Sequence, residues 1–346
     1  MLTLIYFVLI LGVIVLVHEF GHFIFAKRAG IYVYEFSIGM GPQLFKWKRK
    51  NDETLYSIRL FPIGGYVQMA GESVEIDENI PSERRLQSKT WFQRFMTVIA
   101  GIMFNFILAL ILLFVVGLFN GAPKNKPYVS YVDPNGSAYQ AGLTEGSIIT
   151  KIDNVKINTY DRLLLEYQVR LGQKMTFEVT LNSGETRSIT VVPQEVTEDG
   201  VVTYKYGFNL SDNVETGFLS ALKYAFTKTW SLIEQMFFTI IYLCTGKLSL
   251  NSLSGPVGIF TVVGDAAQTG FINLIYLLGF ISINVGFINL LPLPAFDGGH
   301  ILFLIIEKIK GSPVNPKIEN IIHSIGFVLL MILMVVITYN DIARLF

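Results

Sequence analysis

Four stretches of this sequence are long and apolar enough to cross a membrane as helices, and they limit what the chain can fold into. Crossing the hydrocarbon core takes about 20 mostly apolar residues. The stretches lie at residues 2–26, 95–119, 271–291 and 321–339. Only 16% of the residues are charged, whereas soluble domains carry about 25%. The sequence therefore predicts an α-helical polytopic membrane protein.

Basic residues set the expected orientation. One group of Lys and Arg residues lies between the first and second stretches, and a second group lies just before the last: Lys27, Arg28, Lys46, Lys48, Arg49, Lys50, Arg84, Arg85, Lys89 and Arg94, then Lys308, Lys310 and Lys317. Loops rich in Lys and Arg stay in the cytoplasm. Both termini and the region after residue 119 are then expected outside. The first stretch lacks the basic start and small-residue cleavage site of a signal peptide, so it should stay attached.

Charge and cysteine content exclude several classes of function. Lys plus Arg and Asp plus Glu both number 27, so net charge gives no reason to expect a nucleic-acid partner. The single Cys244 can form neither an internal disulfide nor a cysteine cluster for zinc. Any metal would need histidine and carboxylate ligands.

Two further regions differ from the apolar stretches. Residues 120–211 alternate β-branched side chains (YVSYV, FEVTL, SITVV) with turn signals, which predicts a small inserted β-rich domain with one or two helices. Residues 218–244 are apolar but are interrupted by Lys223, Lys228 and Glu234. They suit either a fifth span or an amphipathic helix at the membrane interface.

Three ionisable residues, His18, Glu19 and His22, end the first apolar stretch in VLVHEFGHFIFAKR. Positions i and i+4 share one helix face, so the two imidazoles can hold one ion. Glu19 is placed to act as a general base, as in the HExxH motif of zinc proteases. The motif also occurs by chance, but ionisable residues inside a span cost several kcal/mol and indicate function. The stretch predicts a catalytic metal.

A zinc site of this kind needs a third protein ligand, and Asp297 in INLLPLPAFDGGH is the best candidate. The prolines and glycines around it break regular helix. Lys27 and Arg28 place the histidines near the cytoplasmic end of the first span. Asp297 reaches that end only if residues 218–244 do not cross, because a fifth span would move it about 30 Å away. Four spans are therefore expected.

Taken together, these motifs resemble the site-2 protease family of intramembrane zinc metalloproteases (peptidase family M50). HEFGH lies on the first span and NLLPLPAFDGG on a later one. GSAYQAGLTEGSIITKIDNVKI, residues 136–157, is similar to PDZ domains. Residues 36–71 look like the family's membrane-associated β-hairpin, and SGPVGIF resembles its Gly-Pro segment. The likeness is to the bacterial type, here with room for a single extracytoplasmic PDZ-like domain of α+β fold.

The resemblance implies roles for individual residues. His18, His22 and Asp297 would bind Zn²⁺, and Glu19 would be the general base. Asn289 would orient substrate or stabilise the oxyanion, although an amide that only packs between helices is an equal alternative. Phe296 stands where the family usually has Leu, which implies altered packing. His300 is either a partner of the ligands or an interfacial polar residue, and His323 at the start of the last span needs no catalytic role.

The resemblance also implies an organisation and partners. Residues 1–119 would form the first part of the membrane domain and 120–211 the PDZ-like domain. Residues 212–270 would be interfacial, and 271–346 would complete the membrane domain. The protein would lie in the bacterial inner (plasma) membrane, in contact with lipid, with the termini and the PDZ-like domain extracytoplasmic.

Expected substrates are single-span membrane proteins, such as anti-sigma factors or remnant signal peptides, already trimmed by a site-1 type protease. The PDZ-like domain would filter them by size, and a hairpin edge strand would pair with an unwound substrate. Two alternatives remain. One is a PDZ-bearing membrane scaffold without catalysis, which Glu19→Gln would leave functional. The other is a membrane zinc protease of the CAAX-processing type, which lacks a PDZ domain and uses a different third-ligand context.

Overall fold

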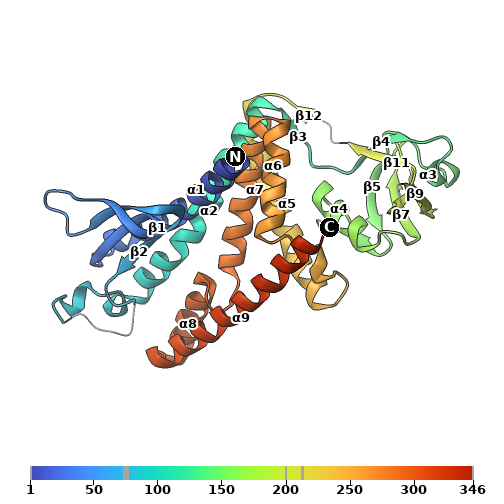
Figure 1. Cartoon of the computed structure of the whole chain (residues 1–346). Helices are drawn as coiled ribbons and strands as arrows, with labels where there is room; N and C mark the ends of the chain where they lie inside the picture. Colours follow the sequence, from blue (N-terminus) through green and yellow to red (C-terminus); the bar gives the residue numbers. More distant parts are fainter. Residues whose placement is uncertain (1, 73–77, 199–200, 212–213, 345–346) are drawn as a thin grey trace. The chain divides into compact units, whose positions relative to one another are not determined.

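The structure, a computed structural model, describes residues 2–72, 78–198, 201–211 and 214–344 (Figure 1). It divides into two compact units, residues 1–112 with 250–346, and residues 113–249. Four of its helices are long and apolar enough to cross a membrane: α1 (Leu2–Arg28), α2 (Trp91–Phe119), α7 (Phe271–Leu290) and α9 (Pro316–Ala343). These four helices confirm the expectation of a polytopic membrane protein.

Small residues let α1 and α2 pack at close range. A Cβ added to Gly21 of α1 would lie 2.5 Å from the carbonyl oxygen of Ala100 in α2. A Cβ added to Gly101 would lie 2.4 Å from Nε2 of His22. Glycines at a helix interface in a membrane allow backbones to approach in this way. The contact brings α2 directly against the helix face that carries the two histidines.

A β-hairpin packs on the last turns of α1. Its strands are β1 (Val33–Lys48) and β2 (Leu55–Met69), and residues 35–38 pair with 65–68 on one side and with 55–58 on the other. Its apolar side chains, among them Val33, Phe36 and Val67, form a core with Ala26 of α1. Figure 1 shows the hairpin alongside α1. Residues 65–69 are thereby placed beside the helix that carries Glu19.

The chain between α7 and α9 holds Asp297 in place. After α7 ends at Leu290, a turn leads into α8 (Asp297–Lys310), and a Cβ on Gly298 would lie 2.0 Å from the carbonyl oxygen of Leu291. Arg94 of α2 donates to both carboxylate oxygens of Glu307 at 2.8 and 2.9 Å. The indole of Trp91 donates to the Leu304 carbonyl at 2.7 Å. These bonds tie α8 to α2.

The other helical segments of this unit are η1 (Ser82–Arg84), η2 (Leu86–Ser88), η3 (Leu250–Ser252) and α6 (Pro256–Thr269), and Val263 of α6 is buried in a core with residues of α1 and α7. At the end of α9, the buried carboxylate of Asp341 accepts hydrogen bonds from the backbone N–H groups of Gly255 and Gly258, at 2.9 and 2.8 Å. It caps the N-terminus of α6, whose first N–H groups lack intrahelical partners.

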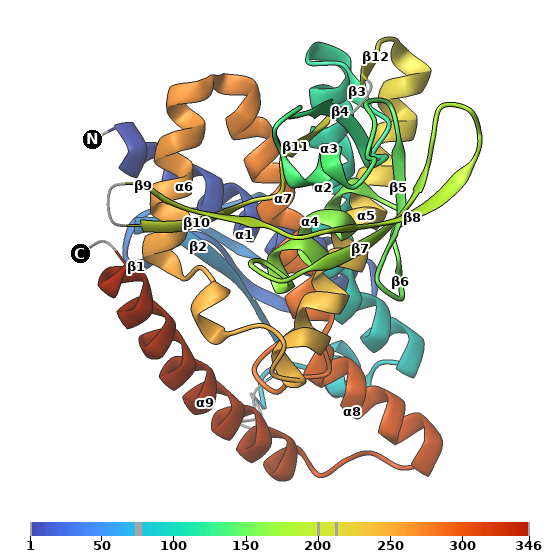
Figure 2. The same ribbon diagram turned by 90° about the vertical axis from the view of Figure 1, so that its right-hand side faces the viewer.

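The second unit contains a sheet of order β11-β4-β5-β7-β8, with β6 beside β5 (Figure 2). Its elements are β3 (Ala122–Pro123), β4 (Tyr128–Val132), α3 (Ser137–Gln140), β5 (Ile148–Ile152), β6 (Val155–Lys156), α4 (Tyr160–Val169), β7 (Met175–Thr180), β8 (Thr186–Val191), β9 (Gln194–Glu198), β10 (Val201–Lys205), β11 (Phe208–Ser211), β12 (Val214–Glu215) and α5 (Phe218–Cys244). Alternate residues of β7, Met175, Phe177 and Val179, enter one apolar core. Residues 199–200 and 212–213 of the expected PDZ-like and interfacial regions lie outside the described residues.

Helix α5 packs against α4 through a buried ion pair and buried hydrogen bonds. The Lys228 ammonium lies 2.6 Å from a carboxylate oxygen of Asp161, and the Ser231 hydroxyl donates to the other oxygen at 2.6 Å. Glu166 accepts from Arg162 and from the Tyr242 hydroxyl, each at 2.6 Å. Helix α5 is not among the candidate spans in the described part of the chain. Lys228, which interrupts the apolar sequence, is here the partner of a residue on α4.

Candidate active site

Three side-chain atoms from two distant segments meet in the first unit. Nε2 of His18 and Nε2 of His22, one turn apart on α1, are 3.2 Å from each other. Oδ2 of Asp297, the first residue of α8, lies 3.1 Å from the first and 3.4 Å from the second. Both histidines are buried, with 8% of their surface exposed. The structure thus brings together the three residues that the sequence predicted as ligands.

This triangle has the dimensions of a zinc site. Tetrahedral zinc holds nitrogen and oxygen at about 2.0–2.2 Å, so neighbouring ligand atoms are about 3.3 Å apart. Oδ2 of Asp297 is a buried atom with no hydrogen-bond donor in the described chain. An acceptor buried without a donor is costly, and a cation between the three atoms would satisfy it.

The hydrogen-bond partner of each Nδ1 atom determines whether the Nε2 atom of the same imidazole carries a lone pair. Nδ1 of His22 lies 2.8 Å from the Thr97 carbonyl oxygen, which can only accept, so this nitrogen carries the proton. Nε2 of His22 then presents its lone pair to the site. A carbonyl partner of this kind is typical of metal-binding histidines. Thr97, on α2, is fully buried.

Asn105 of α2 supports His18 in the same way. Its side-chain amide lies 3.3 Å from Nδ1 of His18. With the amide oxygen turned to this nitrogen, His18 donates from Nδ1 and Nε2 keeps its lone pair. That orientation also gives Oδ1 of Asn105 a partner, which this buried atom otherwise lacks. Asn105 was not among the predicted site residues, although an amide within an apolar span is a functional signal.

Glu19 is held by the hairpin. Its Oε2 accepts a hydrogen bond from the backbone N–H of Val67 at 3.1 Å. Glu19 and the three converging residues line one cavity of about 500 Å³, which His300 and Glu319 also line. The N–H of Val67 is therefore engaged with Glu19 rather than available for pairing with a substrate strand.

Other candidate residues have different surroundings. Asn289, in the last turn of α7, is half-buried and is not among the described residues that line the cavity, so its role stays a prediction.

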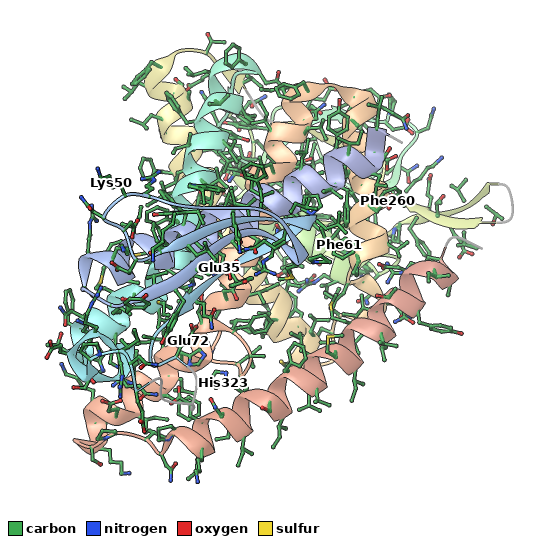
Figure 3. All side chains as sticks on the ribbon, turned by 60° about the vertical axis from the view of Figure 1, so that its left-hand side comes forward. Glu35, Lys50, Phe61, Glu72, Phe260 and His323 are labelled. Carbon is green, nitrogen blue, oxygen red and sulfur yellow. The ribbon has the colours of Figure 1, made fainter. Side chains whose placement is uncertain are left out.

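Nδ1 of His300 lies 3.0 Å from a carboxylate oxygen of Glu319. The His300 ring also stacks on that of His323, with ring centres 4.0 Å apart. His323 does not simply face the headgroups, because its Nδ1 accepts from the N–H of Ala295 at 3.1 Å. Figure 3 labels His323 on α9.

Comparisons with known proteins decide the family. The family model for peptidase family M50 matches residues 6–333. The chain belongs to peptidase family M50. It is 34% identical to the zinc metalloprotease RasP of Oceanobacillus iheyensis, with all of both chains covered. It is 34% identical to the regulator of sigma-W protease RasP of Bacillus subtilis, covering 99% of each. It is 36% identical to a putative zinc metalloprotease of Clostridium acetobutylicum, covering 97% of this chain and 96% of the relative.

Family membership confirms the class of enzyme that the sequence predicted. The protein is an M50 peptidase, a zinc metalloprotease that lies in the membrane. The two RasP alignments run over 426 and 421 positions, more than the 346 residues of this chain. Those longer M50 relatives therefore contain residues that have no counterpart here. The Clostridium alignment spans 335 positions and needs no such insertion.

Proposed function

We propose that this protein cleaves peptide bonds within or beside the transmembrane segments of single-span membrane proteins, using His18, His22 and Asp297 as zinc ligands and Glu19 as general base. One observation carries the proposal. Three buried atoms converge at the spacing of a tetrahedral zinc site, and a carboxylate that is not one of them lines the same cavity.

Each residue has a definable task. When bound, zinc polarises the scissile carbonyl and makes the attacking water more acidic. Val67 fixes Oε2 of Glu19, which leaves Oε1 to take the proton of the water and pass it to the leaving amine. Thr97 and Asn105 hold the imidazoles in the orientation that binding requires. Asn289 is proposed to orient the substrate.

The hairpin is proposed to receive the unwound substrate. A peptide bond in a helix is hidden by hydrogen bonds, so the substrate must become extended before attack, and strand addition is one way to hold an extended chain. Residues 65–69 lie at the edge of the hairpin beside Glu19. Because the N–H of Val67 already donates to Glu19, pairing with a substrate strand must use the backbone groups of the neighbouring residues. Val67→Pro would therefore test the support of Glu19 rather than strand pairing.

The second unit is proposed as an extracytoplasmic PDZ-like filter. The sheet with α3 and α4 supports this. The distribution of basic residues also supports it, because it favours an extracytoplasmic location for the residues after 119. Substrates would reach the inner (plasma) membrane site only after a site-1 type protease had shortened them. The relative named regulator of sigma-W protease supports anti-sigma factors as one substrate class.

The decisive experiment compares wild type with Glu19→Gln in lipid vesicles that contain purified single-span substrates. Glu19→Gln should lower the cleavage rate by about 10²–10⁴-fold, the usual contribution of a general base, with zinc content unchanged. A variant that still cleaves would exclude Glu19 as the base. A variant that works normally in cells would favour a scaffold.

The filter is tested with substrates that differ only in the length of their extracytoplasmic part. Wild type should cleave short ones and reject long ones. A chain lacking residues 120–211 should cleave both. Equal cleavage of short and long substrates by wild type would contradict the filter without affecting the zinc site.

A further inference from the structure

His323 packs beneath the turn that leads to Asp297. Its Nδ1 accepts a hydrogen bond from the N–H of Ala295, two residues before Asp297, at 3.1 Å. A Cβ added to Gly299, two residues after Asp297, would lie 3.0 Å from Cε1 of His323. One turn further along α9, a Cβ on Gly326 would lie 2.2 Å from Cβ of Pro294. The last span therefore contacts the ligand-bearing segment on both sides of Asp297.

The turn at Ala295 needs such support. Ala295 has φ of +77°, the left-handed region that residues with a side chain rarely adopt. Strained backbone of this kind persists where the surrounding structure determines it, and it occurs often at functional sites. In the described chain, the N–H of Ala295 donates a hydrogen bond to His323. Helix α8 begins two residues later, at Asp297.

We infer that His323 is a positioning residue for Asp297. Its Nδ1 holds the Ala295 turn in the conformation that aims the carboxylate at the two imidazoles. The inference rests on the proposed role of Asp297 as a zinc ligand. It adds a contribution from the last span to a site whose other members lie on α1, α2 and α8.

The ring's second nitrogen supports this assignment. Nε2 of His323 is buried and has no hydrogen-bond partner among the described residues, so the polar contact that the ring makes is the one to Ala295. His300, Glu319 and His323 place ligand-type atoms within 4.8 Å of one another. However, the rings of His300 and His323 lie nearly parallel, at 16°. Their in-plane lone pairs run side by side rather than toward one ion.

The test measures zinc affinity of the full-length protein in detergent, by competition with a fluorescent chelator after metal removal. His323→Phe keeps the flat ring but loses the acceptor, and it should weaken zinc binding about tenfold, as the loss of a supporting partner does. His323→Asn places an amide oxygen where Nδ1 was and should restore most of the affinity. Thr338→Val, on an exposed part of the same helix, should bind as wild type does.

The outcomes separate this inference from the proposed function. If Asp297→Asn binds zinc as tightly as wild type, Asp297 is not a ligand and the proposed site itself is wrong. If Asp297→Asn loses zinc but His323→Phe does not, the site stands and the positioning role is overturned. Equal weakening by Asn and Phe would also overturn it, because the acceptor would not matter. Two zinc ions per chain in wild type and one in His323→Phe would make His323 a ligand instead.

Discussion

The cluster of ionisable side chains between α4 and α5 and the cluster of His18, His22 and Asp297 are both buried, but only the first pairs its own charges. At the junction of α4 and α5, Asp161 meets Lys228 and Ser231, and Glu166 meets Arg162 and Tyr242. Every carboxylate there has a cation and a hydroxyl donor. At the cavity of the first unit, the lone pairs of two imidazoles and one carboxylate point toward a common centre.

The difference between the two clusters is how their buried charges are balanced. A buried charge must be paired and hydrogen-bonded, and the α4–α5 junction achieves this with its own side chains. The His18, His22 and Asp297 cluster does not, because the partners of His22 and His18 on α2 direct their lone pairs inward. A cation at the common centre, as we propose, would satisfy it. Apolar side chains should be able to replace the whole cluster at the α4–α5 junction, but they should not be able to replace His18, His22 and Asp297.

Gly101→Ala should produce the largest effect, the loss of zinc binding without any change to a proposed ligand. The new methyl group would lie 2.4 Å from Nε2 of His22 and 2.8 Å from Cε1 of His18, so it would occupy space that the ion and its ligands need. The loss should exceed the roughly 10–100-fold caused by removing a supporting partner. Zinc bound per chain after purification and dialysis measures it.

The matched control is Gly264→Ala in α6, where a Cβ would approach a Thr3 methyl group at 3.2 Å. A flexible side chain can move by a few tenths of an ångström, so this variant should keep its zinc. Wild-type zinc content in Gly101→Ala would show that the ion does not lie between the two imidazoles.

At the α4–α5 junction, Lys228→Met should destabilise the second unit by about 3–5 kcal/mol, the usual result of leaving a buried charge without its partner. The side chain of Asp161 is only 7% exposed, so water cannot replace the ammonium. Combining Lys228→Met with Asp161→Leu and Ser231→Ala removes the whole set and should recover most of the loss. Hydrogen exchange of α4 and α5 measures this stability.

Zinc affinity should stay constant in both Lys228 variants, in contrast to Gly101→Ala. A triple variant as unstable as the single one would show that the ion pair itself, and not the burial of a lone charge, holds α5 to α4.

The sequence predicted what local spacing and composition determine. The i, i+4 spacing places His18 beside His22, and the prolines before Asp297 end a helix where a ligand can emerge. The supports of the site depend on tertiary packing. The carbonyl of Thr97 has no signature in sequence, and Gly101 matters only because α1 approaches it. Lys228 looked like an interruption of an apolar helix because its partner, Asp161, lies on another helix 67 residues earlier.

Asn105→Ala should have a smaller effect than Gly101→Ala, about a tenfold loss of zinc affinity. It leaves all three proposed ligands in place but removes the amide that sets the proton on Nδ1 of His18. Asn105→Asp keeps an oxygen acceptor at the same position, so it should bind zinc more tightly than Asn105→Ala. Chelator competition on the purified variants gives the order. If Asn105→Asp were as weak as Asn105→Ala, the side-chain amide would serve the packing of α2 against α7, near the point where Ser282 donates to the backbone carbonyl of Asn105, and not the orientation of His18.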